Sequence, residues 1–164
     1  MKENTALNYL AGVILIIALA GCFNFDFSGP LIKYTPNPPP APNERVHWVD
    51  YEDEYVRALP FEHEGCILFY AKNELSCGEC DRMDRVFKNQ DIVYLLNNDF
   101  LPIEATDDLP DWERAVARLG IEITPMVIVF DSVHDEVLFA HEGTAVPEKV
   151  FLEMLFDASR KCKE

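Results

Sequence analysis

Positive charge is scarce in this chain of 164 residues, where 14 lysines and arginines stand against 29 aspartates and glutamates. Proteins that bind nucleic acid use cationic side chains to neutralise phosphates, and a formal net charge of −15 opposes that use. The sequence also contains no glycine-rich phosphate-binding loop. We therefore expect no nucleic acid partner and interpret the acidity as a source of solubility.

Metal ligands are also sparse. A structural zinc site needs four ligands, and the close pair Cys77 and Cys80 has no second cluster to complete one. The histidines show no ligand spacing among themselves, so we expect ordinary polar residues at His47, His63, His134 and His141. We accordingly expect no bound metal and no cofactor.

Long hydrophobic runs are missing too. The run "YLAGVILIIALAG", residues 9–21, is about 13 residues long, whereas a membrane-spanning helix needs about 20. A short apolar run after Lys2 is typical of a signal-peptide core. It ends in Leu-Ala-Gly before Cys22, which resembles the lipobox of bacterial lipoproteins. That resemblance implies cleavage before Cys22 and lipid attachment to it; an uncleaved anchor and an ordinary signal peptide are the alternatives.

Three segments follow from this interpretation. We expect a lipoprotein signal peptide at 1–21, a lipid-anchored proline-rich tether at 22–45 and a folded domain at 46–164. The protein would then be anchored in the bacterial cell envelope and face the periplasm, where disulfides can form. In the enterobacterial pattern, an Asp directly after the lipidated cysteine favours retention in the inner membrane. Here that position is Phe23, which favours the outer membrane.

Hydrophobic periodicity predicts an α/β fold in the domain. A first helix is expected to have Asp50 as its N-cap and an apolar face of Trp48, Tyr51, Tyr55 and Leu59. Later strands are expected at 66–71, 99–105, 126–130 and 136–140, and helices around Met83 and Phe87, after Asn89, at 110–119 and from Pro147. This order predicts a central mixed sheet flanked by helices.

The stretch "CGEC" places Cys77 and Cys80 where the strand at 66–71 gives way to a helix. Unpaired N–H groups and the helix dipole at that end favour a thiolate, which is the reactive form of cysteine. Residues three apart lie on the same side of a helix, so Cys80 can reach back to Cys77. The pair is therefore a candidate redox centre; a static disulfide and half of a metal site are the alternatives.

A second motif, Thr124-Pro125, directly precedes the apolar strand at 126–130. A proline nitrogen cannot join the strand ladder, and X-Pro is the one bond at which a cis peptide costs little. A cis proline beside the cysteine pair would leave neighbouring backbone groups free to bind a substrate chain.

Together these motifs resemble the thioredoxin superfamily, and residues 46–158 are similar to the periplasmic thioredoxin-like domains of bacterial thiol–disulfide interchange proteins. The resemblance implies a thioredoxin-like fold in which Cys77 is the nucleophile and Cys80 resolves the mixed disulfide. It also implies that Thr124 and Pro125 contact substrate, with Pro125 as a cis proline facing the pair. No bound cofactor is implied.

The sequence departs from that family in three ways. Ser76 replaces the tryptophan that often precedes the first cysteine, and the stretch "YAKNELSC" is about two residues longer than usual. Residues 65–71 contain no acid, so the proton acceptor of thioredoxins is missing there, and candidate substitutes are Glu74, Glu79 and Glu104. The negative charge of Glu79 should also raise the pKa of Cys77, which favours a more reducing pair.

Two cysteines remain outside the motif. Cys66 falls in a core strand and is expected to be a small buried hydrophobic residue, whereas Cys162, near the end of the chain, is expected to be exposed. A Cys66–Cys162 disulfide is possible only if the two Cα atoms come within about 7 Å, which a sequence does not reveal.

The sequence thus predicts an extracytoplasmic thiol–disulfide oxidoreductase, favoured as a reductase or electron carrier. Its expected partners are protein substrates with thiols or disulfides, a redox partner protein, and the membrane through lipid on Cys22. Two alternatives stay open: a metal-handling lipoprotein that binds copper or zinc through the same thiols, and a non-catalytic thioredoxin-like interaction module.

Overall fold

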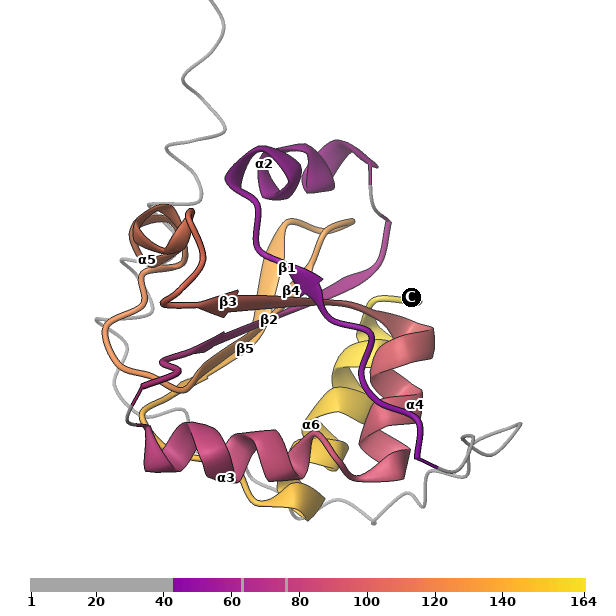
Figure 1. Ribbon diagram of the computed structural model, residues 1–164. Coiled ribbons are helices and arrows are strands. Elements are labelled where there is room, and N and C mark those ends of the chain that lie inside the picture. Colours follow the sequence, from indigo (N-terminus) through magenta and orange to yellow (C-terminus); the bar gives the residue numbers. More distant parts are fainter. Residues whose placement is uncertain (1–42, 63, 76) are drawn as a thin grey trace, which may run out of the picture.

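A five-stranded mixed sheet forms the centre of the computed structural model, which describes residues 43–62, 64–75 and 77–164. The strand order is β1-β3-β2-β4-β5 (Figure 1). The strands are β1 (Val49–Asp50), β2 (Cys66–Lys72), β3 (Phe100–Thr106), β4 (Met126–Asp131) and β5 (Glu136–Glu142). β1, β2 and β3 run parallel, whereas β4 is antiparallel to both β2 and β5. The predicted α/β class with a mixed sheet is confirmed.

Helices cover both faces of this sheet (Figure 1). On one face lie α3 (Gly78–Val86), α4 (Gln90–Asp99) and α6 (Glu148–Lys161), and on the other lie α2 (Asp53–Glu62) and α5 (Trp112–Leu119). None of the helices in the described part of the chain combines the length and apolarity needed to cross a membrane.

The central strand β2 explains why two cores form. Its side chains alternate between the faces: Leu68 and Tyr70 pack with α3, α4 and α6, whereas Ile67 and Phe69 pack with α2 and α5. Both sets are buried, so the strand is apolar from Cys66 to Ala71 instead of alternating with polar residues.

Local signals in the sequence fix several helix ends. The Asn89 side chain accepts hydrogen bonds from the N–H groups of Asp91 and Ile92 and so caps α4. Gly120 ends α5 with a φ of 65°, a conformation that glycine adopts without steric cost. α6 begins directly after Pro147, as predicted.

The predicted start of the first helix is wrong. Asp50 is not an N-cap but pairs with Glu104 at the sheet edge, in the two-residue strand β1, and the helix begins only at Asp53. The N–H of Tyr51 also donates to the carbonyl of Glu104 (2.8 Å). Pairing with the edge of β3 satisfies this backbone, and it prevails over the helical spacing of the aromatic residues.

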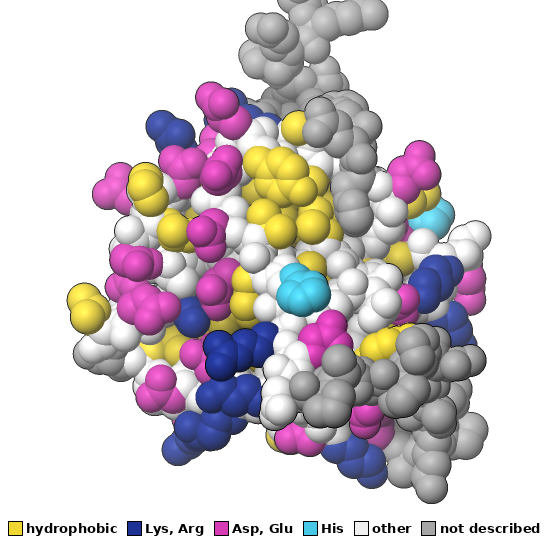
Figure 2. Space-filling view, turned by 45° about the vertical axis from the view of Figure 1, so that its right-hand side comes forward, with side chains coloured by type: hydrophobic (Ala, Val, Ile, Leu, Met, Phe, Trp, Pro, Cys, Tyr) yellow, Lys and Arg dark blue, Asp and Glu magenta, His cyan; other side chains and the backbone are white. Residues whose placement is uncertain are grey.

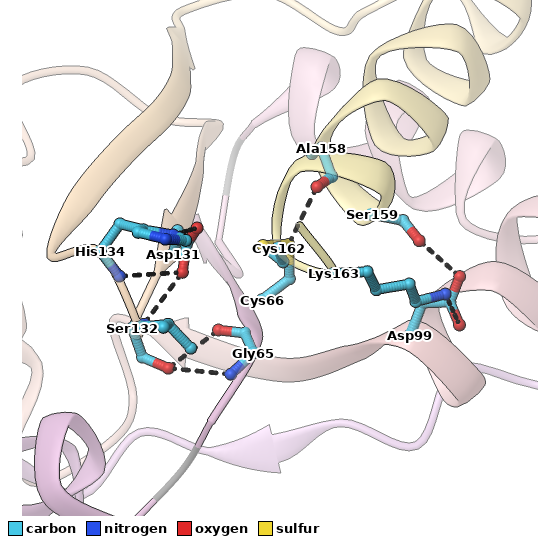
Figure 3. The surroundings of a disulfide bond; sticks show 11 residues. Gly65, Cys66, Asp99, Asp131, Ser132, His134, Ala158, Ser159, Cys162 and Lys163 are labelled. Carbon is cyan, nitrogen blue, oxygen red and sulfur yellow. Dashed lines mark hydrogen bonds and ion pairs between the residues drawn. A yellow bond between two sulfur atoms is a disulfide. The ribbon is translucent and has the colours of Figure 1, made fainter.

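The prediction for Cys66 and Cys162 also needs correction, because the two residues form a disulfide with Cα atoms 5.6 Å apart. Cys66 is buried as expected, but it is not a free thiol, and Cys162 is half-buried instead of exposed. The bond joins the start of β2 to the residue after α6 (Figure 3). Asp99 strengthens the same junction, since its carboxylate accepts from Ser159 (2.6 Å) and pairs with Lys163 (2.8 Å).

Some predictions fall outside the described part of the chain. They are the signal peptide at 1–21, the lipidation of Cys22 and the tether up to residue 42. Asn97 of α4 fixes the segment that precedes β1. Its side chain accepts from the N–H of His47 and donates to the carbonyl of Arg45, both at 2.9 Å.

Candidate functional site

A disulfide between Cys77 and Cys80 lies at the N-terminus of α3, with the two Cα atoms 5.0 Å apart. Cys77 is the N-cap residue, and its Sγ accepts a hydrogen bond from the N–H of Cys80 (3.0 Å). After reduction the same N–H would stabilise a Cys77 thiolate, as would the helix dipole. The two sulfurs differ in access, because Cys77 is half-buried whereas Cys80 is 2% exposed.

The Thr124–Pro125 peptide bond is cis and lies beside this disulfide. Thr124 Oγ1 is 4.0 Å from Cys77 Sγ, and Pro125 is buried directly before β4. The structure therefore brings together all four residues that the sequence singled out in the domain. Ser76, by contrast, lies outside the described residues.

A loop between β5 and α6, residues 143–146, contacts the cis proline through a backbone hydrogen bond. The N–H of Gly143 donates to the carbonyl of Pro125 (2.9 Å), and Gly143 has a φ of 78°. A Cβ atom at Gly143 would lie 3.3 Å from Cγ2 of Ile123, so a side chain there would press on the segment that leads into the cis peptide.

Glu79, between the two cysteines, does not present a free charge to Cys77. One carboxylate oxygen pairs with Arg82 of the same helix, and Oε2 accepts the N–H of Ala145 at 3.1 Å. The predicted electrostatic effect of Glu79 on Cys77 is thus opposed by a neighbouring cation.

A cluster of charged residues lies near Cys80. Lys72, at the end of β2, is 3.0 Å from Glu104, 3.4 Å from Glu74 and 3.5 Å from Asp84. The hydroxyl of the buried Tyr70 donates to Asp84 (2.9 Å) and is 3.3 Å from the Cys80 carbonyl oxygen. Tyr70 therefore links this cluster to the backbone of Cys80.

The surroundings shift the pKa values in this cluster. Burial raises the pKa of Glu104 and outweighs the opposing effect of Lys72. Burial lowers the pKa of Lys72, but its hydrogen bond to Glu104 and the nearby carboxylates outweigh that effect, so the net shift is upward. Burial, together with the charge of Asp84, raises the pKa of Tyr70. The site thus holds a half-buried lysine that stays charged among carboxylates, one of which protonates more readily than usual.

Sequence reasoning named Glu74 and Glu104 but missed two members of the cluster, Asp84 and Lys72. Asp84 could have been found, because it follows Cys80 by four residues and so lies on the same face of α3. Lys72 could not have been found, because its position beside Glu104 depends on the register between β2 and β3, in which Tyr70 pairs with Glu104.

Two exposed apolar side chains lie near Cys77. Leu75 is 86% exposed two residues before Cys77, and Ile123 is 56% exposed just before the Thr124 that approaches Cys77. The backbone around Leu75 is anchored, because the N–H of Glu74 donates to Asp107 (2.8 Å) and that of Leu75 to Asn73 (2.9 Å). Both side chains therefore expose apolar surface close to Cys77.

On the face in Figure 2, acidic side chains lie among basic and apolar ones, and a few basic side chains adjoin one another at the lower left. Within the residues that the structure describes, no group of three or more His, Cys, Asp or Glu is placed to hold a metal ion.

The sequence matches no protein-family model and no curated protein. The structure, however, resembles many solved structures. A thioredoxin from Thermus thermophilus has a TM-score of 0.57 and 21% identity, and the match covers 74% of this chain and 94% of that one. A protein described as DsbH oxidoreductase has a TM-score of 0.58 and 12% identity, with 81% and 95% covered. A thioredoxin from Malassezia sympodialis has a TM-score of 0.54 and 13% identity, with 73% and 95% covered.

These likenesses establish the fold. The chain has a thioredoxin-like fold, an α/β sandwich, and the matches cover 94–95% of the length of those chains. At identities of 12–21% the likeness extends to the fold and no further, so the function must be argued from the site itself.

Proposed function

We propose that this protein is a thiol–disulfide oxidoreductase that exchanges disulfides with protein substrates through Cys77 and Cys80. One observation supports this above all: a disulfide capping α3 joins an accessible sulfur to a shielded one, next to a cis Thr124–Pro125 bond. A purely structural disulfide needs neither the asymmetric access nor the helix N-terminus. The fold shared with thioredoxins and an oxidoreductase is consistent with this reaction.

The reaction proceeds in two exchanges. The Cys77 thiolate attacks a substrate disulfide, a Cys77–substrate disulfide forms, and the first substrate sulfur leaves as a thiolate. Cys80 then loses its proton and attacks Cys77 Sγ, which releases the second substrate thiolate and forms the Cys77–Cys80 disulfide. Two electrons pass from the protein to the substrate, and the reverse sequence oxidises a dithiol instead.

The direction favoured here is reduction. The helix N-terminus stabilises the Cys77 thiolate, but the net negative charge of the chain opposes that stabilisation, and a less stabilised thiolate makes a more reducing pair. No bound cofactor is required, because another protein must supply or accept the two electrons. Lipid on Cys22 would hold the domain at the membrane of the cell envelope, facing the periplasm, with 22–45 as the tether.

The substrate is best described as a protein segment with apolar residues near its cysteine. Leu75 and Ile123, both exposed near Cys77, offer such residues a contact surface. Thr124 precedes the cis bond outside the ladder of β4, so its backbone groups are free of strand pairing and can bind an extended segment.

The exchange chemistry is tested by trapping. In a Cys80→Ser variant the second step is blocked, so mixed disulfides with substrate proteins should accumulate through Cys77 and separate on a non-reducing gel. Cys77→Ser is the matched control, and it should trap nothing. If both variants trap equally, or neither does under mild oxidation, the exchange mechanism is wrong.

Lipid attachment is tested separately. Cells given a radioactive fatty acid should label the wild-type chain and leave a Cys22→Ser variant unlabelled. Label on the variant, or its absence from the wild type, would contradict the proposed anchor without touching the proposed chemistry.

A further inference from the structure

Glu79 links two parts of the site that are 66 residues apart in the sequence. It belongs to the first turn of α3, yet its Oε2 accepts the backbone N–H of Ala145 in the 143–146 loop at 3.1 Å. Its other oxygen pairs with Arg82, which is 63% exposed and therefore contributes little binding energy of its own. The contact with the most structural consequence is the one to Ala145.

The 143–146 loop transmits that contact to the cis proline. At one end Gly143 donates to the carbonyl of Pro125 (2.9 Å) and packs closely under Ile123. At the other end Val146 is buried in the core, 4% exposed. Between these fixed ends, Ala145 is the point at which the loop is joined to the helix that carries both cysteines.

Thr144 is the other anchor of the loop, but it does not reach that helix. The His141 ring Nε2 lies 2.9 Å from the Thr144 carbonyl oxygen and 3.1 Å from its hydroxyl. Since His141 belongs to β5, this contact fixes the loop only to the strand from which it emerges. Glu79 therefore supplies a link that the described Thr144 contacts cannot replace.

We propose that Glu79 is a positioning residue that holds the cis-proline segment in register with Cys77 by anchoring the 143–146 loop to α3, and that it thereby sets the affinity for protein substrates. This inference rests on the proposed function. A protein segment must meet Cys77 and the 123–125 segment at the same time, so it depends on their spacing. A small disulfide needs only Cys77 and should not depend on it.

Two variants separate the hydrogen bond from the charge. Glu79→Ala removes both, whereas Glu79→Gln removes the charge and keeps an oxygen that can accept the Ala145 N–H. Asp81→Ala is the matched control, because it removes another acid from the same helical turn. Each variant is made in the full-length protein and compared with the wild type by circular dichroism before use.

The assay compares two substrates in the presence of dithiothreitol as electron source: the disulfides of insulin and a small aromatic disulfide. Glu79→Ala should raise the KM for insulin about tenfold, as expected for losing a hydrogen bond to a charged acceptor, with kcat for the small disulfide unchanged. Glu79→Gln should restore most of the affinity, and Asp81→Ala should leave both substrates unaffected.

Three results would overturn the proposal: an unchanged insulin KM in Glu79→Ala, a loss in Glu79→Gln or Asp81→Ala as large as the loss in Glu79→Ala, or an equal loss with the small disulfide. The first result would exclude a role of Glu79 in substrate affinity. The second would assign the effect to the lost charge, and the third would assign it to the chemical step. Amide hydrogen exchange provides a readout without activity, since the Ala145 N–H should exchange faster in Glu79→Ala and near the wild-type rate in Glu79→Gln.

This design also separates the two levels of the argument. If the wild type reduces neither substrate, the proposed function fails. If the wild type is active and the Ala145 N–H exchanges at the same rate in Glu79→Ala, the positioning role fails and the exchange chemistry stands.

Discussion

Removing the Cys66–Cys162 disulfide should destabilise the domain strongly. The two residues are 96 apart in the sequence, so the bond closes a loop that includes most of the described domain. Cross-linking a loop of about 100 residues lowers the entropy of the unfolded chain enough to stabilise the folded state by about 4.7 kcal/mol. In a Cys66→Ala/Cys162→Ala variant, the free energy of unfolding should therefore fall by about that amount.

The second disulfide is a built-in control. Cys77 and Cys80 are only three residues apart, and the same relation gives about 2 kcal/mol for so short a loop. A Cys77→Ala/Cys80→Ala variant should therefore be destabilised by less than half as much. The Cys66 side chain is 1% exposed, so its truncation adds a packing loss to the larger effect.

Urea unfolding followed by circular dichroism measures both changes. At equal slopes, the midpoint of the Cys66→Ala/Cys162→Ala variant should fall well below that of the other variant. Trapping through Cys77 should survive when these two substitutions are combined with Cys80→Ser, because β2 separates the two disulfides, with Cys66 at its start and Cys77 beyond its end. Equal stability of the two variants, or a loss below about 1 kcal/mol, would refute the loop-closure reasoning.

Two further predictions concern the surface. Leu75→Asp should raise the KM for insulin several-fold and leave the reduction of a small disulfide unchanged. Val133→Asp, a change at another exposed apolar residue, should leave both unchanged. Equal effects at both positions would show that Leu75 is no substrate contact. The hydrogen bond to Asp131 raises the pKa of His134, so this pair stabilises the fold below the unfolded pKa of about 6.5 and the contribution is lost as pH rises through the folded value. His134→Ala should accordingly lower the melting temperature more at pH 5.5 than at pH 8.5, and a loss that does not depend on pH would contradict the charge-based reading.

Much of the fold could be predicted because its signals are local. Continuous apolar runs mark β2 and β4, Asn89 and Gly120 mark helix ends, and the order of elements then defines the sheet. The strand β1 could not be predicted, since two residues are too few for a periodic pattern and their pairing with β3 depends on the folded sheet.

The site divides in the same way. The cysteine pair and Thr124-Pro125 are short motifs whose residues can be recognised one by one. The contact from Glu79 to Ala145 and the Cys66–Cys162 bond join segments that are 66 and 96 residues apart, and nothing in either segment alone points to the other. Such contacts follow from the folded arrangement: the sequence left the Cys66–Cys162 bond open as a possibility, and the structure shows that it forms.

The central claim is tested most directly by the equilibrium reduction potential of Cys77 and Cys80. The full-length protein is equilibrated against a series of dithiothreitol and glutathione buffers, and alkylated peptides are quantified by mass spectrometry so that Cys66 and Cys162 are followed separately. We expect a reversible two-electron couple nearer the thioredoxin value of about −270 mV than the strongly oxidising value of about −120 mV. A pair that shows no reversible couple, or reduced protein that is isolated with a bound metal, would contradict the proposed exchange function.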